Sequence, residues 1–65
     1  MNQNEKILVW MKRNGSITPW EALEYIGCMR LSARIADLKA LGHNIGSEQV
    51  KHANRHYSRY FIKEG

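Results

Sequence analysis

Disulfides are the first stabilising device that this sequence lacks. The chain of 65 residues holds one cysteine, Cys28, which has no second cysteine to pair with. A lone thiol suits a reducing compartment, so we expect the protein in the cytoplasm. A chain this short buries only about 60% of the surface that its unfolded state exposes, so one efficient core has to stabilise a single domain over residues 1–65.

Long apolar runs are also missing. No stretch approaches the roughly 20 apolar residues that cross a bilayer, and the N-terminal residues lack the basic-then-apolar order of a signal peptide. Hydrophobic residues nevertheless make up 43% of the chain, which is too much for a disordered segment. The composition therefore predicts a compact, soluble domain without a membrane partner.

Motifs of catalysis and metal binding are absent as well. We find no glycine-rich phosphate loop, no nucleophile motif and no paired carboxylates, so we expect no enzyme, no cofactor and no small-molecule ligand. His52 and His56 are four positions apart, and only Cys28 and His43 are left to complete a metal site. His52 and His56 are expected to flank a turn and not to share a helix face, and there is no second cysteine. Structural zinc needs four ligands in tetrahedral geometry, so we expect no metal site.

The chain carries an excess of positive charge, which is unevenly distributed along the sequence. The formal net charge is +4, and the stretch from Gln49 to Lys63 carries four Lys or Arg residues, two His residues and no acid. A basic end on a body of mixed charge favours contact with a polyanion. A basic face that only keeps a small protein soluble is the alternative.

The first helix is predicted from about Asn4 to Asn14, where apolar residues recur at helical spacing. Asn4 or Asn2 can cap its start, and Asn14 with Gly15 ends it, because both residues tolerate positive φ. Ser16 and Ile17 follow, too few for a helix, and we expect a brief strand there.

The second helix has a strong start signal. Thr18 can cap it, Pro19 supplies the preset φ of the first helical position, and Glu21 can close a capping box. We expect Gly27 to stop this helix. The side chains expected to point inward are those of Ala22, Leu23 and Ile26.

The third helix is predicted from Arg30 or Leu31 to Leu41, with Gly42 as its C-cap. Its apolar face consists of Leu31, Ile35, Leu38 and Leu41. The opposite face is unusually bare and consists of Ser32, Ala33, Ala36 and Ala40.

After Gly42 the period becomes that of strands. We expect a β-hairpin with strands near 45–51 and 56–63, and Asn54 as the residue of positive φ in its loop. Trp10, Trp20 and Tyr25, like the aromatic residues of the second strand, are expected in or half-covering the core. Three helices, a short strand after the first, and a hairpin wing make an α+β fold of winged helix-turn-helix type.

The residues from Ser16 to Ile45 also resemble a known family. The segments are Ser-Ile-Thr-Pro-x-Glu-Ala-Leu, a glycine turn, then Leu-Ser-Ala-Arg-Ile-x-Asp-Leu and Leu-Gly-x-Asn-Ile. They are similar to small helix-turn-helix domains common in phage and prophage genomes. This resemblance implies a DNA-binding regulator of phage or prophage type in the cytoplasm of a bacterial host cell.

In such a fold the second helix of the unit enters the major groove, about 12 Å wide, and small outer side chains let its backbone come close. We therefore predict contacts to bases or phosphates from Arg30, Ser32, Ala33 and Ala36. The phosphate contacts that we predict come from Lys39, Lys51, His52, Arg55, His56 and Arg59. Arg34 and Asp37, three positions apart, are expected to pair along the helix surface instead.

The sequence thus favours a protein that binds duplex DNA sequence-specifically, as a transcriptional regulator or an excisionase-like architectural factor. It would act as a dimer or as adjacent copies, since one copy reads few base pairs. The alternative is a protein-interaction module whose bare helix face docks on a phage or host protein.

Overall fold

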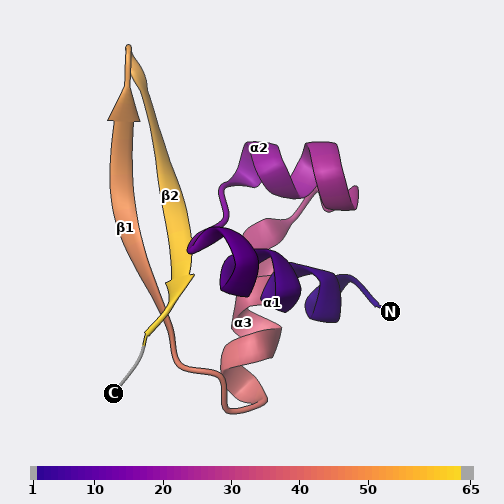
Figure 1. The fold of residues 1–65 in the computed structure, drawn as a ribbon. Coiled ribbons are helices and arrows are strands. Elements are labelled where there is room, and N and C mark those ends of the chain that lie inside the picture. The colour runs from indigo at the N-terminus through magenta and orange to yellow at the C-terminus, as the bar shows by residue number, and fades with distance from the viewer. Residues whose placement is uncertain (1, 64–65) are drawn as a thin grey trace.

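The computed structural model describes residues 2–63 (Figure 1). Its elements in chain order are α1 (Gln3–Asn14), α2 (Pro19–Glu21), η1 (Ala22–Ile26), α3 (Leu31–Ala40), β1 (Ile45–His52) and β2 (Arg55–Ile62). Since η1 continues α2 without a break, the chain forms three helical segments and then an antiparallel hairpin. The predicted winged helix-turn-helix architecture is confirmed. Within residues 2–63, no helix has the length and apolar character to cross a membrane.

The ends of α1 follow from its capping residues. Of the two predicted caps, Asn2 is the one used, because its side-chain oxygen accepts from the backbone N–H of Glu5 at 2.8 Å. At the other end Gly15 adopts a φ of 87° and donates its N–H to the carbonyl of Met11. Both interactions satisfy backbone groups that a helix end leaves without partners.

The start of α2 is the predicted capping box. The hydroxyl of Thr18 accepts from the backbone N–H of Glu21 at 3.3 Å, and the Glu21 carboxylate accepts from the N–H of Thr18 at 2.9 Å. The helix then widens into the π-helical turn η1 and stops at Gly27, as predicted. The prediction that Leu23 points inward was wrong, since this side chain is 51% exposed. A wider turn no longer follows the 3.6-residue period from which that position was predicted.

The helix α3 keeps most of its predicted apolar face. Leu31, Ile35 and Leu38 are buried, whereas Leu41, also expected inside, is 71% exposed. The helix ends at Ala40, so Leu41 is the C-cap residue and lies beyond the last turn that packs on the core.

The hairpin pairs its strands from Ile45 with Ile62 at the root to His52 with Arg55 at the tip. Each strand runs one residue closer to the tip than the sequence predicted, so the turn is Ala53-Asn54. The residue of positive φ is therefore Ala53, at 57°, and the prediction of Asn54 was wrong. The predicted brief strand exists as one bridge, in which Ile17 and Tyr60 exchange backbone hydrogen bonds of 2.8 and 2.9 Å.

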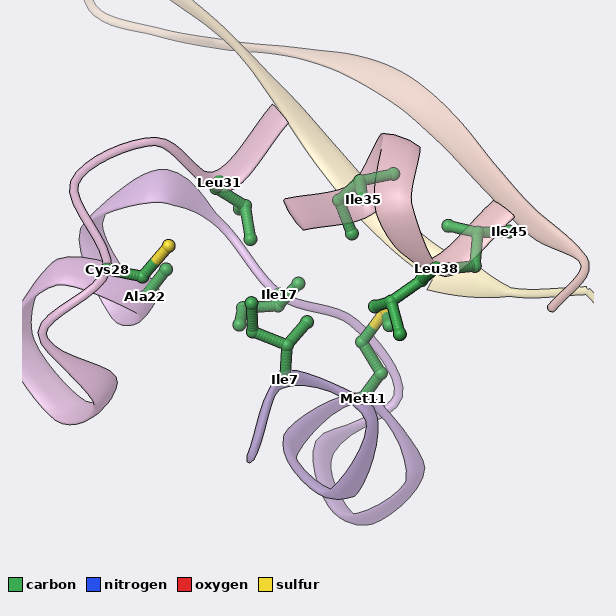
Figure 2. Close-up of a cluster of buried hydrophobic side chains, with 9 residues drawn as sticks. All are labelled: Ile7, Met11, Ile17, Ala22, Cys28, Leu31, Ile35, Leu38 and Ile45. Atoms are coloured by element: carbon green, nitrogen blue, oxygen red, sulfur yellow. The ribbon is translucent and has the colours of Figure 1, made fainter. Parts of the chain in front are cut away.

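The core joins α1, η1, α3, the Ile17 bridge and the hairpin (Figure 2). Ile7 and Met11 of α1 meet Ile35 and Leu38 of α3, and Ile45 closes the end nearest the hairpin. The remaining buried side chains are those of Ile17, Ala22, Cys28 and Leu31. Full burial of one large aliphatic side chain stabilises by about 1.5–3 kcal/mol. This packing fixes α3 and the hairpin root, and leaves the hairpin tip projecting past the helices (Figure 1).

Candidate nucleic-acid interface

The outer face of α3 is as bare in the structure as in the sequence. Ser32, Ala36 and Ala40 are exposed and Ala33 is half-buried, while Leu31, Ile35 and Leu38 hold the other side of the helix in the core. Cations stand at both ends of this face. Arg30 at the N-cap position and Lys39 in the last turn are both exposed.

The predicted pairing of Arg34 with Asp37 is confirmed. Their side chains approach to 3.1 Å, and each is partly exposed. Because the arginine offsets the carboxylate, the one acidic residue of α3 does not leave an uncompensated negative charge beside the bare face.

The register divides the hairpin into two faces, because paired residues share a face and successive residues alternate. The helix-side face carries Ile45, Ser47, Gln49 and Lys51 of β1 with Ile62, Tyr60, Ser58 and His56 of β2. The outer face carries Gly46, Glu48, Val50 and His52 of β1 with Phe61, Arg59, Tyr57 and Arg55 of β2.

The helix-side face meets the start of α3. Ser58 and Tyr60 line a groove together with Arg30 and Ser32, so the start of α3 and the middle of β2 contribute to one groove. Tyr60 also packs against the core, which fixes this part of the hairpin. Lys51, paired with His56, extends the same face toward the tip.

On the outer face, two arginine side chains are engaged by other side chains of the protein. Arg59 donates to the carboxylate of Glu48 across the strands, with its Nε at 2.7 Å. The guanidinium of Arg55 lies over the indole of Trp20, 5.7 Å from the ring centroid, and Tyr57 meets the same ring edge-on at 6.5 Å. Trp20 therefore joins the start of α2 to the half of the hairpin that is nearer its tip.

The structure thus separates residues that the sequence grouped together. Arg30 and Ser32 adjoin the helix-side face, which also carries Lys51 and His56, whereas His52, Arg55 and Arg59 lie on the outer face. The sequence analysis missed Ser58 and Tyr60 in the groove. Strand alternation within the predicted hairpin, where Lys51 stands opposite His56, would have placed both on the same side as Lys51.

The two predicted turn histidines do not converge. Since His52 belongs to the outer face and His56 to the helix-side face, their imidazoles extend from opposite sides of the hairpin. Among residues 2–63, no three His, Cys, Asp or Glu side chains gather in a way that would hold a metal ion.

Comparison with known proteins agrees with this geometry. Residues 2–65 match the family described as winged helix-turn-helix domain. The chain belongs to this winged helix-turn-helix family. No curated protein and no solved structure matches the chain. Membership suggests DNA binding, and the winged helix-turn-helix is typically a non-enzymatic fold.

Proposed function

We propose that this winged helix-turn-helix domain binds duplex DNA sequence-specifically, with α3 in the major groove and the hairpin on the phosphate backbone. One observation carries the proposal. The bare face of α3 begins at Ser32, which lines one groove together with Arg30 and with Ser58 and Tyr60 of the helix-side face, and Lys51 and His56 continue that face toward the tip. Small side chains let a helix backbone approach the base edges, and lysines and arginines beside it hold the phosphates.

Base contacts are assigned to the first half of α3. Arg30 can bond a guanine edge through two parallel hydrogen bonds, Ser32 can bond a base or phosphate, and the methyl groups of Ala33 and Ala36 can meet thymine methyl groups. Such contacts would carry the sequence specificity, each good bidentate pair discriminating by about 1–3 kcal/mol.

Phosphate contacts are assigned in two groups. Lys51 and His56 lie on the helix-side face, Lys39 is exposed in the last turn of α3, and none of the three is held in an ion pair within residues 2–63. His52 and Arg55 would reach the backbone from the hairpin tip. Arg59 would join only after release from Glu48, so its contribution is the smallest.

The role that fits such a domain is that of a phage- or prophage-type transcriptional regulator or excisionase-like architectural factor in the bacterial cytoplasm. Such a domain would act by occupying a site, bending DNA or recruiting another protein. A dimer or adjacent copies would supply the specificity that one copy lacks.

Fluorescence anisotropy with a mixed pool of duplexes across a salt series tests the proposal. If five or six phosphates are engaged, the slope of log K against log salt is about −5, at roughly 0.9 per phosphate. Weak binding with a flat slope at low salt would overturn the proposal. Pull-down experiments would then test the alternative that the bare face docks on a protein.

Matched variants place the contact on the molecule. Ala36→Glu puts a carboxylate on the bare face and should weaken duplex binding by roughly tenfold or more, since a charge forced into an interface costs above 1.4 kcal/mol. Val9→Glu adds the same charge on the side of α1 away from α3 and should leave binding nearly unchanged. Equal losses in both variants would mean that α3 is not the DNA-facing helix.

A further inference from the structure

A second surface lies between α1 and η1, where aromatic side chains form the floor of a shallow groove. The indole of Trp10 and the ring of Tyr25 stack with centroids 4.8 Å apart and planes inclined by 19°. Tyr25, expected in or beside the core, is 61% exposed. The residues that line this aromatic groove are Lys6, Val9, Trp10, Arg13, Asn14, Tyr25 and Ile26.

The aromatic groove faces away from the proposed DNA surface. Ile7 and Met11 direct one side of α1 into the core, toward α3 (Figure 2). Successive residues of a helix are rotated by about 100°, which carries Lys6, Val9 and Arg13 to the other side of α1. A duplex on α3 would therefore leave the aromatic groove open to a second molecule.

The charge around the groove has one sign. Lys6 and Arg13 are exposed, and neither enters an ion pair within residues 2–63. They lie seven positions apart on α1, which separates them by about 10.5 Å along the helix axis. Among residues 2–63, no acidic side chain lines the groove. An apolar floor between two separated cations suits a ligand with an apolar centre and carboxylates on either side.

We propose that the aromatic groove docks an acidic amphipathic segment of a partner protein. One large apolar side chain of the segment rests on Tyr25 and Trp10, and its carboxylates pair with Lys6 and Arg13. The docking goes beyond DNA binding and does not depend on it. With both surfaces in use, the domain would hold a partner on the side opposite the duplex.

Charge and ring geometry decide against two other occupants. A second copy placed groove to groove would bring four cations together, which repels at close range. A single nucleic-acid strand needs a row of cations along its phosphates and free aromatic faces for its bases. Within the described residues 2–63 the aromatic groove offers two cations, and Trp10 and Tyr25 already cover one face of each other.

Trp10 supplies a reporter for the docking. Its indole N–H is buried and has no acceptor within residues 2–63, and Trp20→Phe makes it the one tryptophan of the chain. Amide and indole NMR shifts can be followed while helical peptides are added. The probes are peptides with a central phenylalanine flanked by glutamates seven positions apart, and matched peptides with lysine for glutamate.

The expected result is saturable shifts at Trp10, Tyr25, Lys6 and Arg13 with the glutamate peptides and none with the lysine peptides. Arg13→Glu and Tyr25→Ala should each weaken peptide binding roughly tenfold, a loss of about 1.4 kcal/mol. Ala36→Glu should leave peptide binding unchanged, and Tyr25→Ala should leave duplex binding unchanged. These arms separate a failure of docking from a failure of the proposed DNA function.

Three results would overturn the docking proposal. They are the lack of saturable binding of any glutamate peptide, equal shifts with a single-stranded oligonucleotide, and shifts in the groove that depend only on protein concentration. Circular dichroism checks the fold of each variant. If Tyr25→Ala unfolds, the exposed Arg13→Glu decides the test by itself.

Discussion

The two faces of the hairpin share a backbone but differ in what their side chains do. On the helix-side face, Ile45 and Tyr60 pack with the core, and polar residues and Lys51 continue toward the tip. On the outer face, Arg59 is paired with Glu48 and Arg55 lies over Trp20. A run of basic residues in a strand is therefore not one basic surface, because alternation gives its members to two faces.

The largest effect should come from the root of the helix-side face. Ile45→Ala is expected to lower the free energy of unfolding by about 2–5 kcal/mol, since it removes buried methyl groups and leaves a cavity. Urea denaturation measures the loss. Val50→Ala, at a half-buried position of the outer face, is the control and should cost about 1 kcal/mol or less. Similar losses would contradict the difference between the faces.

The next effect concerns the support of the outer face. Trp20→Ala removes the edge-on contact with Tyr57 and the cation–π contact with Arg55, worth together about 1–2 kcal/mol. A double-mutant cycle with Arg55→Ala measures the coupling, which we expect near 0.5–1 kcal/mol in thermal unfolding. If the two losses simply add, Trp20 does not hold Arg55 in solution.

A substitution in the turn that joins the two strands should have the opposite effect and raise the stability of the fold. Ala53 holds a φ of 57°, where a Cβ costs about 1–2 kcal/mol and glycine does not have that cost. Ala53→Gly should therefore raise the melting temperature by a few degrees, since a gain of about 1 kcal/mol shifts a domain of this size by roughly 4–8 °C. Asn54→Gly, without a positive φ to relieve, should bring no gain.

The smallest effect belongs to the exposed ion pair. Glu48→Gln should cost about 0.2–1 kcal/mol at low salt, because both partners are partly exposed to solvent. The loss should shrink in 1 M salt, where the Debye length falls to about 3 Å. A loss that salt leaves unchanged would indicate that Glu48 acts through packing and not through charge.

Local features were predictable from the sequence. The capping box of Thr18 and Glu21 and the left-handed glycines 15 and 27 depend on a few neighbouring residues. The order of helices and the hairpin follows from them and from periodicity. Two predictions of buried side chains were wrong. Leu23 is exposed because the helix continues as a π-helical turn that the 3.6-residue period does not predict, and Leu41 is exposed because it lies just past the end of α3.

The candidate site was predictable only in part. The bare face of α3 follows from helical periodicity and is present in the structure. The division of the basic residues between the two hairpin faces follows from strand alternation, because the predicted strands already set Lys51 opposite His56. The sequence analysis grouped these residues without applying that alternation. The contacts of Arg55 with Trp20 and of Arg59 with Glu48 join residues distant in sequence, and no local pattern indicates them.

The most direct test is a map of backbone amide NMR shifts on addition of a duplex selected from the pool. We expect the largest shifts on the outer face of α3 and along the helix-side face of the hairpin, at Ser32, Ala36, Lys51 and Ser58. The residues around Lys6 and Tyr25 should hardly move. Largest shifts at Glu48 and Arg59, or around the aromatic groove, would contradict the account.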